Sequence, residues 1–313
     1  MNIDIFELHY YLRDNGHSVD SIIKNKCESE ILAIFIEAAN ILDINIEINS
    51  VLPAEGGFRD LWKLLGENAN QITLLLTILT LVMSRIPVSD PETEQLDKEI
   101  KQLTIEEKKL SIQKLKKELE EKSINSETVK KVADVVDKNL KITKRKSNFY
   151  SHLTYYPKVN QVGFNAKNID NIKNNQDEKT VLSRDFYKFI LKSNRLSSLK
   201  DDSALIEIIS PVLKEGRYKW KGIYNNVPIS FDMNDYSFRE EVLSEKHSFK
   251  HGSTIKCELM IGRELNEVGD VAITGYTVTT VIEIRDGNSL ITTPQGLKFK
   301  QAKKFSDSQG ELF

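Results

Sequence analysis

The sequence has few of the residues that mark small disulfide-stapled folds or low-complexity chains. Its 313 residues include only 2 cysteines, 7 prolines and 14 glycines. Cys27 and Cys257 lie far apart in the sequence, which excludes a disulfide framework and a cysteine-rich metal module. The low glycine and proline content excludes a collagen-like chain. A chain of this length is expected to form about two domains.

An excess of charge of one sign is also absent. Lysine and arginine number 44 against 46 aspartates and glutamates, which gives a formal net charge of −2. The chain therefore has no overall field that would attract it to nucleic acid or to an anionic membrane. Its N-terminus has acids and no basic segment, so no signal peptide is predicted. Together with the free cysteines and the lysine-rich composition, this predicts the bacterial cytoplasm or inner membrane.

Residues 1–66 predict a small α+β module. Apolar residues recur at helical spacing over 31–42. Residues 44–51 alternate β-branched and polar side chains, which is typical of a strand. The paired glycines Gly56 and Gly57 then permit a tight turn.

The most unusual segment is 67–88, where no charge occurs between Glu67 and Arg85. A bilayer crossing needs about 20 apolar residues, with roughly 17 as the lower limit, and several polar residues dilute this run. Two interpretations are open: a membrane helix whose threonine face lines a pore or packs against its copies, or a helix buried in the core of a soluble oligomer. The side chains expected to matter in both cases are Thr73, Leu75, Thr77, Leu79, Thr80 and Val82.

Residues 89–164 predict a charged helical stalk with a basic and aromatic end. The two apolar seams within 91–122 have different registers, which favours a bundle or twisting stalk over one continuous coiled coil. Near its end lie Lys141, Lys144, Arg145 and Lys146, followed by several aromatic residues. This cluster suits an anionic lipid surface or nucleic acid. The alternative is a cationic helix end favoured by the helix dipole.

The polar stretch 165–180 predicts a linker, and 181–313 predicts a β-rich domain with a loose tail. A hairpin is expected around Asn225 and Asn226, and further strands follow. The predicted fold class is therefore α+β. It has a small N-terminal α/β module, a central apolar helix, a charged helical stalk and a C-terminal β-rich barrel or sandwich.

No catalytic motif is present. The sequence contains no phosphate-binding loop, dinucleotide fingerprint or nucleophile elbow. His247 and His251 form the only close histidine pair, in a segment that reads as a loop, and Asp235 is expected to cap a short helix. No catalytic residue, cofactor or metal is predicted, and the protein is expected to be non-enzymatic.

Both ends of the chain resemble bacterial proteins carried in prophages and antiphage-defence islands. The N-terminal resemblance lies in the strand at 44–51, the Glu-Gly-Gly-Phe turn at 55–58 and the charge-free helix. The C-terminal resemblance lies in Pro211, Trp220, Asp235, Phe238, Phe249, Gly252 and the Tyr-Thr-Val run at 276–278. The resemblance implies host defence or phage biology and supplies no catalytic residue.

Two hypotheses about function follow. The first is a homo-oligomeric antiphage-defence protein, whose apolar helix perturbs the inner membrane or forms a channel as an abortive-infection effector. Its expected partners are its own copies, the inner membrane or other anionic lipid, and a protein encoded in the same operon, with nucleic acid left open. The second is a soluble sensor module whose β-domain recognises a ligand, protein or nucleic acid.

Overall fold

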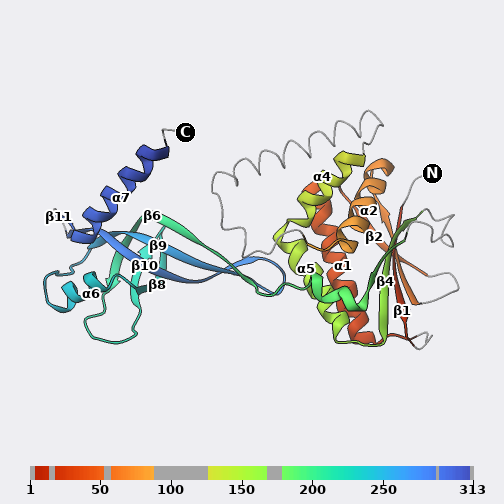
Figure 1. The fold of residues 1–313 in the computed structure, drawn as a ribbon, viewed down its shortest axis with the longest axis horizontal. Coiled ribbons are helices and arrows are strands. Elements are labelled where there is room, and N and C mark those ends of the chain that lie inside the picture. Colours follow the sequence, from red (N-terminus) through yellow and green to blue (C-terminus); the bar gives the residue numbers. More distant parts are fainter. Residues whose placement is uncertain are drawn as a thin grey trace. The chain divides into compact units, whose positions relative to one another are not determined.

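The chain folds into two compact units, each with its own hydrophobic core (Figure 1). Unit 1 comprises residues 1–194 together with 265–270, and unit 2 comprises 195–264 and 271–313. The computed structural model describes residues 4–13, 18–52, 58–87, 126–167, 178–286 and 289–310. The predicted charged helix at 91–122 lies outside the described residues.

Unit 1 is built on a sheet of five antiparallel strands. Their order is β2–β3–β1–β4–β5, so the central strand pairs with segments from both ends of the unit. The strands are β1 Ile5–Leu12, β2 Glu47–Val51, β3 Phe58–Leu65, β4 Val159–Lys167 and β5 Lys179–Leu182. The strand predicted at 44–51 is present, but it begins three residues later, at Glu47.

Helices pack on one face of this sheet. They are α1 Ser21–Leu42, α2 Ala69–Ser84, α4 Ser126–Asp137, α5 Leu140–Thr154 and the 3-10 helix η2 Ser183–Phe189. Helix α1 begins before the apolar pattern at 31–42 because Asp20 accepts hydrogen bonds from the backbone N–H groups of Ile22 and Ile23. Asn139 caps the start of α5 in the same way.

Alternation along β1 separates the hydrophobic core from the opposite face of the sheet. Phe6 and Tyr10 belong to the core beneath the helices. Glu7 and His9 therefore point to the other face, since successive side chains of a strand project to opposite sides. The Phe6 ring meets Phe35 of α1 edge-on at 5.0 Å between centroids. Such aromatic pairs contribute about 0.5–1.5 kcal/mol beyond the area they bury.

Helix α2, which the sequence marks as charge-free, lies in the core of unit 1. Leu75, Leu79 and Val82 are fully buried there. The helix packs against α4 and against strands β3, β4 and β5. No helix among the described residues combines the length and apolar character that a bilayer crossing requires.

The threonines of α2 find their hydrogen-bond partners within the helix. Thr77 Oγ1 donates to the carbonyl oxygen of Thr73 at 2.8 Å, and Thr80 Oγ1 donates to that of Leu76 at 2.9 Å. Threonine side chains often bond to the preceding turn in this way. The hydroxyl groups of Thr77 and Thr80 therefore need neither pore water nor a partner chain to donate a hydrogen bond.

The boundaries predicted from the sequence differ from those of the two units. The described parts of the segments expected as a module (1–66), an apolar helix (67–88) and a stalk (89–164) belong together to unit 1. Both ends of the predicted linker at 165–180 lie in strands, because residues up to Lys167 extend β4 and β5 begins at Lys179. Polar residues were misleading at these strand ends because one face of the sheet is itself polar.

Unit 2 contains a closed barrel of five strands. Of the two architectures predicted for this region, the barrel is confirmed and the sandwich is not. Around the barrel the order is β6–β7–β8–β10–β9, and β9 pairs with β6 to close it. Strands β8 and β10 run parallel, and β11 pairs only with β10. The strands are β6 Arg195–Ser210, β7 Trp220–Tyr224, β8 Val227–Met233, β9 Thr254–Leu265, β10 Val271–Asp286 and β11 Ser289–Thr292.

The local turn and cap signals of unit 2 are confirmed, whereas the loose tail is not. Asn225 and Asn226 both have positive φ in the β7–β8 turn, as a two-residue hairpin requires. Asp235 caps α6, Tyr236–Leu243, by accepting from the N–H of Phe238. The tail beyond Lys303 was predicted to be loose, but helix α7, Pro294–Gly310, continues through it as far as Gly310.

Candidate functional site

The outer face of β7 and β8 places one exposed cation, Lys221, beside apolar side chains. The register places Lys221 opposite Ser230, and Ile223 opposite Pro228, on the outside. Trp220 and its partner Phe231 point inward and are buried. This outer surface can hold an extended ligand against apolar atoms while Lys221 remains exposed to solvent.

The connection between β6 and β7, residues 211–219, adds further cations and an aromatic ring. It contains Lys214, Arg217 and Lys219 with a single acid, and Tyr218 is 57 % exposed. Arg239 Nη2 of α6 donates to the carbonyl oxygen of Gly216 at 3.0 Å, which ties the loop to the barrel. An exposed ring between cations offers one stacking surface and several contacts for phosphate groups.

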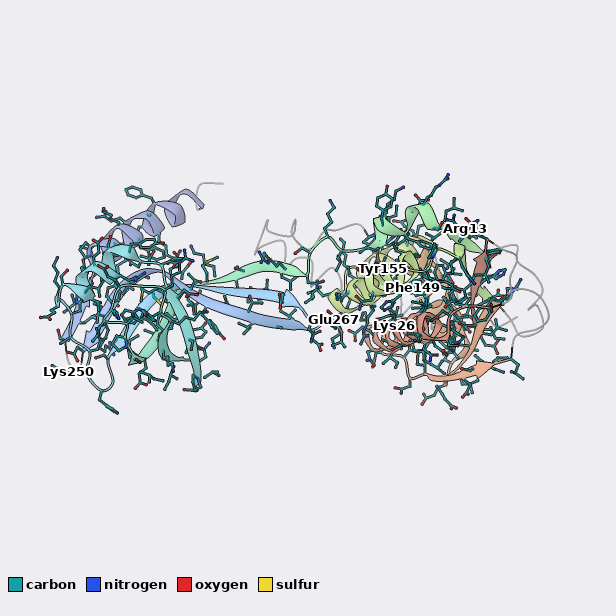
Figure 2. The ribbon with its side chains drawn as sticks, turned by 90° about the horizontal axis from the view of Figure 1, so that it is seen from below. Arg13, Lys26, Phe149, Tyr155, Lys250 and Glu267 are labelled. Carbon is teal, nitrogen blue, oxygen red and sulfur yellow. The ribbon has the colours of Figure 1, made fainter. Side chains whose placement is uncertain are left out.

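The basic cluster predicted from the sequence does not form one surface. Lys141 pairs with Asp270 at 3.0 Å, and Arg145 pairs with Glu30 at 3.0 Å. Asp270 belongs to the turn 265–270, in which Figure 2 labels Glu267. Asn148 Nδ2 donates to the carbonyl oxygen of Glu267 at 3.0 Å. These two cations of α5 thus hold other elements of unit 1.

The remaining two cations of the cluster are buried. Lys144 Nζ donates to Asn194 Oδ1 at 3.1 Å. Lys146 is fully buried, donates to the carbonyl oxygens of Val82 and Arg85 at 3.1 Å each, and pairs with Asp137. Burial lowers the pKa of Lys146, and the nearby Asp137 opposes this shift. Lys146 therefore closes the C-terminal end of α2 rather than meeting an anionic surface.

A polar cluster that sequence reasoning missed covers the outer face of the unit 1 sheet. Glu7 is fully buried between Arg59 Nη1 at 2.6 Å and Lys167 Nζ at 2.5 Å. The register of β1 with β3 and β4 brings these strands together. The available signal was the alternation of Glu7 and His9 with the core residues of β1. This alternation does not indicate which residues pair with Glu7. Its partners, Arg59 and Lys167, lie about 50 and 160 residues further along the chain, and strand pairing brings them to β1.

The second half of this cluster joins an imidazole, a carboxylate and a phenol. Tyr11 donates to Glu178 Oε2 at 2.6 Å, and His9 Nδ1 lies 3.4 Å from Glu178 Oε1, within ion-pair distance. A side chain at Gly163 would strike this carboxylate, because a Cβ there would lie 2.0 Å from Glu178 Oε1. Burial raises the pKa of Glu178, but its bonds from His9 and Tyr11 outweigh burial and lower it overall. The cluster ties β1, β4 and the start of β5 together.

The two cysteines and His247 are placed in environments typical of structural residues. Burial raises the pKa of the Cys27 thiol to about 12 and also raises that of Cys257, so both are poor nucleophiles at neutral pH. His247 Nε2 lies 2.9 Å from Glu241 Oε2. Within the part of the chain that the structure describes, no three histidine, cysteine or acidic side chains are grouped to hold a metal.

No protein-family model, curated protein or solved structure matches the chain.

Proposed function

We propose that unit 2 is a single-stranded nucleic-acid-binding domain that uses the outer face of β7 and β8 and the loop at 211–219. The observation that carries the proposal is the connectivity of the barrel. Three antiparallel strands in succession are followed by a helix and then by two strands, and the third and fifth strands run parallel. This is the strand order of the OB fold, a five-stranded Greek-key barrel that binds oligonucleotides on its second and third strands and adjoining loops.

The side chains at that location support nucleic acid as the ligand. Lys214, Arg217, Lys219 and Lys221 offer four cations over one loop and the strand that follows it. Lys219 also pairs with Asp232 at 3.4 Å, between two half-exposed side chains, which is a weak interaction in water. Tyr218 supplies a ring on which a base can stack, and stacking tolerates any sequence.

The salt dependence of binding gives this proposal a quantitative form. Each phosphate neutralised on a single strand contributes about −0.7 to the slope of log K against log salt. Four contacts therefore predict a slope of about −2.8, or a loss of roughly 50-fold between 50 and 200 mM salt. A slope of log K against log salt near zero would show that these four cations do not contact phosphate groups and would contradict the proposal.

Nucleic-acid binding favours the sensor hypothesis over the membrane hypothesis. An antiphage-defence role, self-association, contact with anionic lipid and a partner from the same operon all remain proposals. Leu75 and Leu79 of α2 are buried inside unit 1, so this helix does not offer them to a bilayer.

The test uses the full chain and fluorescein-labelled 20-mers of single-stranded DNA and RNA in fluorescence anisotropy. We expect the triple variant Lys214→Gln/Arg217→Gln/Lys219→Gln to weaken binding and to flatten the salt slope. Its matched control removes three other cations of unit 2, namely Lys246→Gln/Lys250→Gln/Arg285→Gln. Equal affinities for the two triple variants would contradict the proposed surface.

Tyr218→Ala tests stacking separately from charge. We expect it to cost about 1–3 kcal/mol, which is roughly 5- to 150-fold in Kd. The control is Tyr236→Ala, since Tyr236 is an equally accessible tyrosine, 69 % exposed at the start of α6. Double-stranded DNA of the same sequence should bind more weakly than either single strand.

A further inference from the structure

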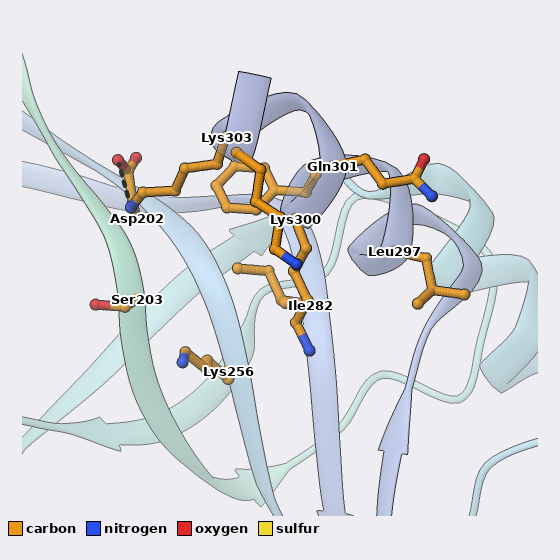
Figure 3. A pocket seen from close by; sticks show the side chains of 10 residues that line it. Asp202, Ser203, Lys256, Ile282, Leu297, Lys300, Gln301 and Lys303 are labelled. Atoms are coloured by element: carbon orange, nitrogen blue, oxygen red, sulfur yellow. Dashed lines mark ion pairs between the residues drawn. The ribbon is translucent and has the colours of Figure 1, made fainter. Parts of the chain in front are cut away.

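An open pocket of about 490 Å³ lies between helix α7 and the barrel (Figure 3). Pockets for small molecules usually measure about 300–1,000 Å³. Its walls come from β6, β9, β10 and α7, and none of the residues that line it lies on β7 or β8. They are Asp202, Ser203, Lys256, Ile282, Leu297, Phe299, Lys300, Gln301, Lys303 and Lys304.

Hydrogen bonds fix the start of α7 against β10. Thr293 Oγ1 donates to the carbonyl oxygen of Val281 at 2.5 Å and accepts from the N–H of Gly296 at 2.9 Å. Gly296 lies so close to β10 that a Cβ would sit 2.1 Å from the carbonyl oxygen of Ile282. The helix is thus held at its first turn, and the pocket opens along the next turns. Because these contacts fix α7 to β10, the helix forms a defined wall of the pocket.

The lining combines an apolar wall with an excess of positive charge. Ile282, Leu297 and Phe299 supply the apolar surface. Four lysines stand against one acid, Asp202, which Lys303 approaches to 3.5 Å. Lys300 is engaged by Glu283 outside the pocket at 2.5 Å.

Among the described residues, two lysines of the lining have no ion-pair partner within 4 Å, although Lys256 is within electrostatic reach of Glu283. Lys256 and Lys304 form no ion pair with any other residue in the described ranges. They come from β9 and from α7, so they approach the pocket from two of its walls. An ammonium group is a compact point charge that binds phosphate from many directions. An anionic ligand is therefore the chemistry that these two residues fit.

We propose that this pocket binds a nucleoside phosphate. The base would pack on Phe299 and its apolar neighbours, on the side of the ring away from Lys200, whose Nζ lies 5.9 Å from the ring centroid. The phosphate groups would lie between Lys256 and Lys304. Ser203 and Gln301 offer a hydroxyl and an amide for the polar edge of the base. The three apolar residues make a wall of limited length, which suits a ring better than a long acyl chain. The proposal is independent of nucleic-acid binding by β7 and β8.

Isothermal titration calorimetry on the full chain tests this pocket with ATP, AMP, adenosine, inorganic phosphate and palmitate as separate ligands. We expect ATP and AMP to bind, and adenosine and phosphate each to bind at least tenfold more weakly. Tighter binding of palmitate than of AMP, or no binding of ATP at millimolar concentration, would overturn the proposal.

Matched variants on the same helix assign the binding to the pocket. Phe299→Ala and the double variant Lys256→Gln/Lys304→Gln should each weaken ATP binding about tenfold or more. Phe305→Ala and Lys298→Gln should leave it unchanged, because neither residue lines the pocket and Phe305 is 72 % exposed. Circular dichroism confirms that each variant is folded. Equal ATP affinities for the Phe299 and Phe305 variants would place the ligand elsewhere.

Discussion

Replacing Lys146 by methionine tests whether the basic end of α5 serves the fold or a surface. Methionine keeps most of the length and the apolar stem of lysine but removes the ammonium group. In the wild-type protein this group donates to the carbonyl oxygens of Val82 and Arg85 at 3.1 Å each and pairs with Asp137. The variant therefore leaves two carbonyl groups at the end of α2 without this donor and one buried carboxylate without its nearest cation.

The expected cost is large because the pair is buried. Removing one partner of a buried ion pair typically costs about 3–5 kcal/mol. Arg85 Nη2 lies 3.6 Å from Asp137 Oδ2 and would compensate part of the charge, so the lower end of this range applies. For a domain of 150–250 residues, 1 kcal/mol corresponds to about 2–4 °C in Tm, which predicts a fall of roughly 6–12 °C.

Thermal unfolding followed by circular dichroism measures this difference. Lys141→Met is the matched control, because Lys141 lies on the same helix and its pair with Asp270 is half-exposed. Such exposed pairs contribute little to stability, because water screens the two charges. A second variant, Lys146→Met with Asp137→Leu, removes both charges and should recover part of the loss. If Lys146→Met unfolds at the same temperature as Lys141→Met, the burial of Lys146 described here is incorrect.

Three shorter predictions concern the core and the polar cluster of unit 1. Leu75→Ala should destabilise the protein by about 2–5 kcal/mol in chemical denaturation without changing its mass in light scattering, whereas dissociation of an oligomer would place α2 at an interface. The pKa of Glu178 is lowered in the folded protein, so its ionised form contributes stability above its ordinary pKa and loses it as pH falls through the folded value. The Tm difference between wild type and Glu178→Gln should accordingly be positive at pH 7 and shrink at acid pH. Gly163→Val should reproduce the loss seen in Glu178→Gln at pH 7, because the new side chain occupies the position of the carboxylate; a variant as stable as wild type would show that the contact is dispensable.

Strands and tight turns were the most predictable parts of the fold. The alternation at 227–231 and the Asn225–Asn226 turn depend only on neighbouring residues, and both appear in the structure. The α+β class and the β-rich C-terminal unit follow from such local signals. Helix α7 was missed because its sequence is polar and has few apolar residues at helical spacing. Its first turn is fixed by Thr293, whose partners lie on β10 and cannot be read from the helix itself.

The apolar helix α2 shows why composition alone left two environments open. A run without charge is expected both in a bilayer and in the middle of a helical layer, since both exclude water. The difference lies in what surrounds the helix. In unit 1 the surrounding groups include the buried ammonium of Lys146, which reaches the carbonyl oxygen of Val82 from a helix about 60 residues further along the chain.

Cations that lie close together in sequence need not form one surface, and the pocket beneath α7 draws its cations from distant parts of the sequence. On a helix, residues three or four apart share a face, so Lys141, Lys144 and Arg145 lie on one side of α5, whereas Lys146 points away from them. Each of the four nevertheless meets a different partner in unit 1. Lys256 and Lys304 belong to different elements, yet the barrel and α7 bring them to one pocket with Phe299. No local pattern announces such a pocket, because its charge and its apolar wall are assembled only when β6, β9, β10 and α7 meet. The side chains of this pocket that would recognise a ligand are therefore the ones that the spacing of residues in the sequence predicts least well.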